Sequence, residues 1–114
     1  MSIRGSYLRR TVMDADGRVA GRIEATYPFD GSTPEFAIVR CGRFGHRVMV
    51  PVAEFRTSGE VVTMPYSRTD LEDAPELDGI RYVDDAVSRS RGYWSLVSPD
   101  RPVQLRYLPL TPVG

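Results

Sequence analysis

The residues with the clearest capacity for chemistry are the single cysteine, Cys41, and the single histidine, His46. A thiol beside an imidazole is the pairing of a cysteine nucleophile with its general base, and both groups are also zinc ligands. On two antiparallel strands joined by a short tip, the two side chains would lie near each other. A structural zinc site usually needs four ligands, however, and the sequence has no second cysteine or histidine. We therefore predict no catalytic, metal-binding or cofactor-binding residues and no enzymatic activity, and we assign the pair to packing at the end of a hairpin.

The turn from Asp14 to Gly17 has the spacing of aspartates and glycine that is found in calcium-binding loops. If Gly17 occupied the sixth position of such a loop, Val12 and Ile23 would occupy its first and twelfth positions. Both positions require oxygen ligands, which valine and isoleucine lack. The segment is therefore interpreted as a tight turn between two strands.

Acidic residues concentrate between residues 60 and 85, where eight acids and two arginines give a net charge of −6. The segments on either side each carry a net charge of +3, so the whole chain is neutral, and every basic residue is an arginine. Segments of opposite charge favour contact between two copies of the chain. The same charges are also accounted for if they simply lie on faces exposed to water, without any partner. Five of the carboxylates, in residues 70–78, either bind a cation or a basic partner or support a short helix; we expect the helix-supporting role.

The candidate interaction surface consists of basic and aromatic residues at the tip of the predicted hairpin and near the C-terminus. Arginine beside aromatic rings in residues 40–47 is typical of surfaces that stack on RNA bases and contact phosphates. A neutral chain without a basic stripe makes contact with a protein the first hypothesis and RNA the alternative. Tyr93 and Trp94 are either interface anchors or core residues. The predicted surface comprises Arg43, Phe44, His46, Arg47, Tyr93 and Trp94.

Alternation of apolar and polar residues predicts a chain built mainly from strands, which we expect at residues 7–13, 19–27, 36–41, 48–52, 53–56 and 61–64. The central hairpin spans Glu35–Val52, with Gly42 and Gly45 at its tip. Within residues 19–27, strict alternation places Val19, Gly21, Ile23, Ala25 and Tyr27 on one face. A glycine inside that strand, Gly21, predicts a bend or a close approach of another backbone.

Beyond residue 65 the pattern changes. Ser67 and Asp70 have the spacing of a capping box, which predicts a short helix that Pro75 ends. Residues 84–91 have a weak helical pattern, and residues 93–97 are apolar enough for a strand or a packed extension. A last strand is predicted at residues 103–107, either closing the edge of the sheet or reaching a second copy.

Four segments in this order together resemble the PRC-barrel domain family. They are Asp16-Gly17-x-x-x-Gly21-x-Ile23, Phe36-Ala37-Ile38-Val39-x-x-Gly42-x-Phe44-Gly45, Val50-Pro51 and Leu71-Glu72-Asp73-Ala74-Pro75-Glu76-Leu77. The resemblance covers residues 7–77 and implies a small antiparallel β-barrel that serves in binding and assembly. It carries no shared catalytic motif, and it does not extend to residues 78–114.

The expected fold is therefore mainly all-β: a small antiparallel β-barrel of about six strands with one or two short helices. Residues 1–77 form the barrel-like domain, and residues 78–114 form a C-terminal extension that packs on the barrel or on a second subunit. A single cysteine fits a reducing compartment, and neither a signal-peptide h-region nor a membrane-spanning stretch is present, so we expect a cytoplasmic protein that does not contact a membrane.

The expected function is that of a non-enzymatic interaction or assembly module that forms a homodimer or binds a protein partner, without a cofactor. Association with RNA or the ribosome through the hairpin tip is the alternative. A small-ligand-binding barrel is a third possibility.

Overall fold

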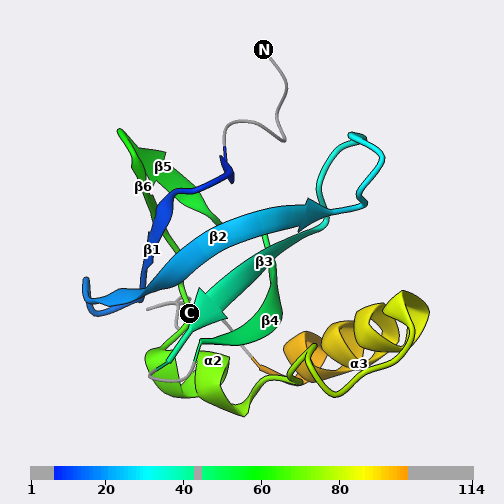
Figure 1. The fold of residues 1–114 in the computed structure, drawn as a ribbon. Coiled ribbons are helices and arrows are strands. Elements are labelled where there is room, and N and C mark those ends of the chain that lie inside the picture. The colour runs from blue at the N-terminus through cyan, green and yellow to red at the C-terminus, as the bar shows by residue number, and fades with distance from the viewer. Residues whose placement is uncertain (1–6, 43–44, 98–114) are drawn as a thin grey trace, which may run out of the picture.

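Six strands form one curved sheet in the order β4-β3-β2-β1-β6-β5 (Figure 1). The structure, a computed structural model, describes residues 7–42 and 45–97. The strands are β1 (Thr11–Met13), β2 (Val19–Tyr27), β3 (Phe36–Cys41), β4 (His46–Pro51), β5 (Arg56–Ser58) and β6 (Val61–Thr63). Two helices accompany them, α2 (Arg68–Asp73) and α3 (Val83–Leu96). The prediction of a mainly β fold with about six strands and one or two helices is confirmed, although α3, with 14 residues, is not short.

The sheet differs from the expected barrel in two respects. It is mixed, because β1 and β6 run parallel while every other neighbouring pair is antiparallel. Hydrophobic alternation predicts that a segment is a strand, but it does not indicate whether two strands far apart in sequence pair in parallel or antiparallel. In the described part of the chain, β4 and β5 are the two edges of the order and are not paired with each other, so a closed barrel is not confirmed.

Strand β2 has the predicted bounds, but the residues that it buries are not the ones that strict alternation predicted. Its buried residues, Ala20, Ile23 and Thr26, are spaced by three positions and not by two. Two register shifts cause this spacing: one where β2 pairs with β1 and another, between Ile23 and Ala25, where it pairs with β3. Each bulge inserts a residue and moves the following side chains to the opposite face. Glu24 is the extra residue of the second bulge, and it faces solvent.

Other strand bounds shift for local reasons. β1 begins at Thr11, whereas the sequence predicted residue 7, because Arg9 has a φ of 66° that an extended strand does not allow. β5 begins at Arg56, because the amide of Phe55 donates to the carbonyl of Val52 and closes a turn first. Strand β3 is buried on both faces except at Arg40, as its continuous apolar run predicted.

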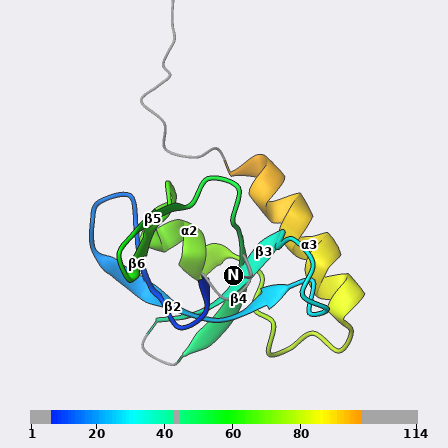
Figure 2. The same cartoon turned by 90° about the horizontal axis from the view of Figure 1, so that it is seen from above.

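The short helix α2 confirms the predicted capping box. The amide of Asp70 donates to the Ser67 hydroxyl oxygen at 3.1 Å, and the Asp70 carboxylate accepts from the amide of Ser67 at 3.0 Å. The helix ends before Pro75, whose ring disfavours a helical conformation for Ala74. It buries Leu71 and lies across one end of the curved sheet (Figures 1 and 2).

Helix α3 corrects the prediction for residues 93–97, which are not a strand. The helix continues to Leu96 through Ser90 and Gly92 and lies alongside β4 (Figure 2). A buried stripe at helical spacing, not intrinsic propensity, stabilises it. The stripe consists of Ala86, Val87, Ser90 and Trp94. The predicted strand at residues 103–107 lies outside the described residues.

Neither described helix is long and apolar enough to cross a membrane.

Candidate interaction surface

The predicted surface at the hairpin tip is described only in part, because Arg43 and Phe44 lie outside the described residues. Cys41 and His46 pair directly across the ladder of β3 and β4, at the end of the hairpin. The thiol is buried, and this burial raises the pKa of Cys41, with a further contribution from the negative charges of Glu72 and Glu76. A protonated thiol is neither a nucleophile nor a good metal ligand, so Cys41 acts as a core residue.

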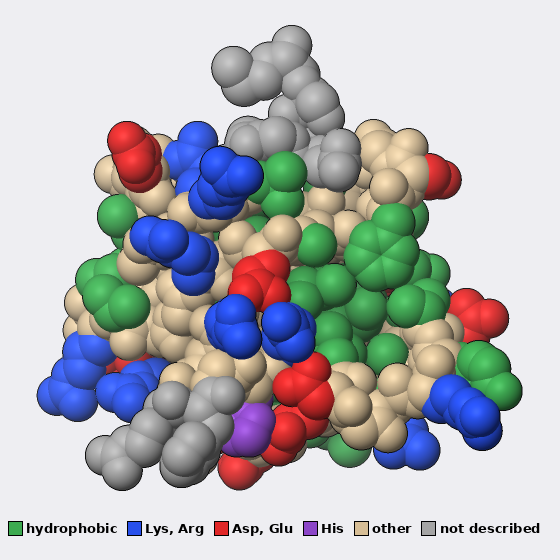
Figure 3. All heavy atoms as spheres, viewed as in Figure 1, with side chains coloured by type: hydrophobic (Ala, Val, Ile, Leu, Met, Phe, Trp, Pro, Cys, Tyr) green, Lys and Arg blue, Asp and Glu red, His purple; other side chains and the backbone are tan. Residues whose placement is uncertain are grey.

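His46 and Arg47 contact carboxylates from distant parts of the chain. His46 Nδ1 lies 2.8 Å from a carboxylate oxygen of Glu76. Arg47 donates from Nε to Glu24 at 2.8 Å and from Nη1 to Asp78 at 3.1 Å. Figure 3 shows the histidine beside acidic side chains on this face. No pattern in the sequence indicated these partners, because the carboxylates lie far from the hairpin along the chain.

Glu24 joins two arginines of the hairpin. Its second carboxylate oxygen accepts from Arg40 Nη1 at 3.0 Å, in addition to the contact with Arg47. The hydrogen bond from Arg47 lowers the pKa of Glu24, and the charges of both arginines act in the same direction. Glu24 is the extra residue of the bulge in β2, and among the described residues of the hairpin the two arginines expected to face RNA, Arg40 and Arg47, are ion-paired within the chain.

Residues 76–78 are held against the outer edge of β4. Val48 and Glu76 form an isolated antiparallel bridge, and the amide of Leu77 donates to the carbonyl of Arg47 at 2.8 Å. The chain turns directly after this bridge, and the turn holds Asp78 near His46. One ligand atom each from His46, Glu76 and Asp78 lie within 4.8 Å of one another, and we call these residues the His46 cluster.

The other two predicted surface residues, Tyr93 and Trp94, connect α3 to the rest of the fold. Trp94 is 6% exposed, and its indole N–H donates to the carbonyl of Met49 at 2.6 Å. The hydroxyl of Tyr93 donates to the carbonyl of Asp70 at 2.7 Å, and partial burial raises the pKa of Tyr93. These placements agree with the core alternative for both aromatic residues.

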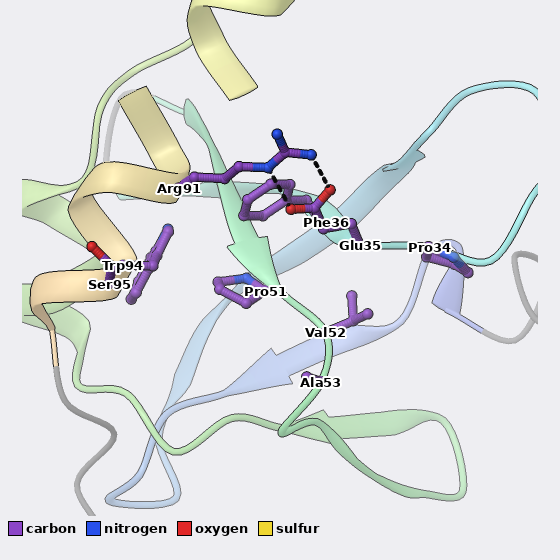
Figure 4. Close-up of a pocket in the computed structure, with 9 residues that line it drawn as sticks. All are labelled: Pro34, Glu35, Phe36, Pro51, Val52, Ala53, Arg91, Trp94 and Ser95. Carbon is purple, nitrogen blue, oxygen red and sulfur yellow. Dashed lines mark hydrogen bonds and ion pairs between the residues drawn. The ribbon is translucent and has the colours of Figure 1, made fainter. Parts of the chain in front are cut away.

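A groove of about 380 Å³ lies between the last turns of α3 and the ends of β3 and β4 (Figure 4). Its walls are mainly apolar, and one ion pair crosses its rim. Arg91 donates from Nε and Nη2 to the two oxygens of Glu35, both at 2.7 Å, and this bond lowers the pKa of Glu35. The lining residues are Pro34, Glu35, Phe36, Pro51, Val52, Ala53, Arg91, Trp94 and Ser95.

Exposed apolar side chains gather around a second depression, of about 120 Å³, between the β2–β3 loop and the start of α3. Three of the five large apolar side chains that are exposed in the described residues line it: Phe29 (52% exposed), Tyr82 (62%) and Val83 (44%). Figure 3 shows a broad apolar area on this face. We call the depression the Phe29 hollow; its lining residues are Phe29, Ile38, Met49, Leu77, Ile80, Arg81, Tyr82, Val83 and Ala86.

The sequence did not single out the Phe29 hollow, because its exposed members come from the β2–β3 loop and from the N-terminal end of α3, which share no periodic pattern. The only available signal was a phenylalanine and a tyrosine placed among turn-forming residues. Phe29 is held in place by an edge-to-face contact with Tyr27, whose ring centroid lies 5.4 Å away. The ring thus packs against Tyr27 on one side and is exposed on the other, and such a contact reduces the conformational entropy that Phe29 loses when a partner binds.

Comparison with models of protein families finds none that matches the chain, and comparison with curated proteins finds no significant similarity.

Proposed function

We propose that this chain is a non-enzymatic interaction module that associates with a second copy of itself through the Phe29 hollow. The observation that carries the proposal is the gathering of Phe29, Tyr82 and Val83 around one depression. Isolated exposed apolar side chains are ordinary, whereas a contiguous patch marks a contact surface. Aromatic side chains such as Phe29 and Tyr82 are also typical anchors of such surfaces.

A second copy is favoured as the partner because of the charges at the rim. A two-fold contact requires a patch that is complementary to itself. The lining of the hollow includes one cation, Arg81, and the first turn of α3, whose Val83 also lines the hollow, carries two acids, Asp84 and Asp85. The chain has no net charge, so two copies approach without long-range repulsion.

Size-exclusion chromatography with light scattering, on the chain and on two matched variants, tests this proposal. Phe29→Ser removes an exposed anchor and is expected to shift the protein from dimer to monomer. Val19→Ser changes an equally exposed apolar residue, 61% accessible, at the opposite end of β2, and is expected to leave the dimer unchanged. Equal dimer content in both variants would exclude the Phe29 hollow as the interface.

We also propose a PRC-barrel-like architecture and a cytoplasmic location. Three observations support the PRC-barrel-like architecture. They are the four sequence motifs that occur in the order of that family, the positive φ of Gly17 in the β1–β2 turn and the close approach of β3 to Gly21. The single buried cysteine, Cys41, supports a reducing compartment.

The alternative function, RNA association at the hairpin tip, gains no specific support from the described residues. Arg40 and Arg47 both donate to Glu24, and Arg47 also donates to Asp78. Phosphate binding would have to replace these carboxylates. Binding to single-stranded RNA that weakens steeply as salt is raised would favour this alternative over self-association.

A further inference from the structure

The His46 cluster has the composition and spacing of a transition-metal site, and we propose that it binds one Zn²⁺ ion per chain. His46 supplies an imidazole nitrogen, and Glu76 and Asp78 supply carboxylate oxygens. This site shares no residue with the lining of the Phe29 hollow, which it adjoins at Leu77, and zinc binding and self-association are measured in separate experiments.

The distances suit a single small cation. Zinc lies about 2.0–2.2 Å from nitrogen and oxygen ligands, so two ligand atoms around one tetrahedral ion are roughly 3.3–3.6 Å apart. In the cluster, His46 Nδ1 and a Glu76 oxygen are 2.8 Å apart, and all three ligand atoms lie within 4.8 Å of one another. Small side-chain rotations therefore suffice to place the three atoms around one ion.

The backbone holds the ligands in position before any ion arrives. Glu76 lies in the bridge to β4, and Asp78 lies in the turn that follows directly, which the amide of Ile80 closes by donating to the carbonyl of Leu77 at 3.0 Å. The bridge between Val48 and Glu76 and the hydrogen bond from Leu77 to Arg47 fix that segment beside β4, next to His46. A preorganised set of ligands loses less conformational entropy on binding than a set on mobile loops.

The charges and the ligand types favour zinc over calcium or magnesium. Two carboxylates balance a divalent cation, and an imidazole nitrogen is a poor ligand for the hard cations. The side chains of His46, Glu76 and Asp78 are 44%, 49% and 50% exposed, so an ion reaches them from solvent and water completes its coordination.

Arg47 is the internal competitor for this site. Its guanidinium lies 3.1 Å from Asp78, so its positive charge competes with zinc for that carboxylate. Arg47 then keeps its contact with Glu24 at 2.8 Å, which lowers the cost of the exchange. The structure thus predicts that removing the arginine strengthens zinc binding, which an adventitious surface site elsewhere would not show.

Calorimetric titration of the untagged full-length protein with ZnCl₂ tests the proposal. We expect one ion per chain, with affinity reduced at least about tenfold by His46→Ala or Asp78→Asn. We expect Arg47→Gln to tighten binding. Asp30→Asn is the matched control, because Asp30 is an exposed carboxylate whose hydrogen bonds, within the described residues, go to the nearby Ser32, and it should leave binding unchanged.

A second readout needs no variant. Because His46 is the only histidine, its ring resonances in an NMR spectrum report on the site without ambiguity. Zinc is expected to shift them at one equivalent, whereas Mg²⁺ at the same concentration is not. Zinc binding that leaves these resonances in place, or an affinity that His46→Ala does not change, would overturn the proposal, as would the absence of binding.

Discussion

Replacement of Gly21 tests how closely β2 and β3 are packed. An added Cβ would lie 2.4 Å from the carbonyl oxygen of Arg40 and 2.8 Å from a methyl carbon of Val39. Both partners belong to β3, which is paired on one side with β2 and on the other with β4. The carbonyl therefore cannot move away without disturbing the ladders on both sides. Gly21 has a negative or extended φ, so the clash alone explains why glycine stands there.

The expected cost of Gly21→Ala follows from two opposing terms. Overpacking a buried site costs about 1–3 kcal/mol, and contact with rigid backbone places this case at the upper end. Replacing glycine by alanine within a strand returns about 0.5–1 kcal/mol of backbone entropy. We therefore expect a net loss of about 2 kcal/mol in the free energy of unfolding, which corresponds to a fall in Tm of roughly 8 °C for a domain of this size.

Urea denaturation followed by the fluorescence of Trp94, the only tryptophan, measures this loss. Gly79→Ala is the matched control, because a Cβ at Gly79 would meet no atom of the described residues within 4 Å and its φ is not positive. This control is expected to be neutral or to gain up to about 1 kcal/mol. A Gly21→Ala variant within 0.5 kcal/mol of the unaltered protein would refute the close approach of the two strands.

Three further changes have predictable effects on stability. Ser67→Ala removes the cap of α2 and is expected to lower the free energy of unfolding by about 1 kcal/mol, measured by urea denaturation. Ser67→Asp keeps a capping oxygen and should retain most of the stability. Trp94→Phe leaves the carbonyl of Met49 without its indole donor, and we expect a loss of about 1–3 kcal/mol, measured by thermal unfolding followed by circular dichroism. Because Arg91 lowers the pKa of Glu35 in the folded state, the pair stabilises the protein above the unfolded pKa of about 4.5 and loses that stabilisation as pH falls through the folded value. For this exposed pair, the free energy of unfolding of the unaltered protein should exceed that of Glu35→Gln by at most about 1 kcal/mol at pH 7, and the difference should vanish near pH 2. A difference that grows on acidification would contradict the stabilising role of the pair.

Local signals predicted the hairpins and the cap, and the structure bears them out where they act over a few residues. The bounds of β2 and β3 follow from apolar runs, and the start of α2 follows from Ser67 and Asp70. Alternation failed within β2, because a bulge depends on the partner strand and leaves no trace in one strand's own pattern. Helix α3 was underestimated for a similar reason, since its packing against β4 outweighs a serine- and glycine-containing sequence.

The candidate surfaces were harder to predict than the strands. Trp94 and Arg47 were singled out by residue type alone, which does not show whether a side chain is buried or ion-paired. The Phe29 hollow and the His46 cluster both join segments that are distant in sequence, and contacts of that kind appear only once the register between segments is known.

Sedimentation equilibrium of the unaltered chain, over concentrations from about 1 μM to about 1 mM, tests self-association most directly. The Phe29 hollow predicts a mass that rises with concentration and levels off near twice the 12.8 kDa of a single chain. A mass that stays at 12.8 kDa throughout this range would contradict the proposed function.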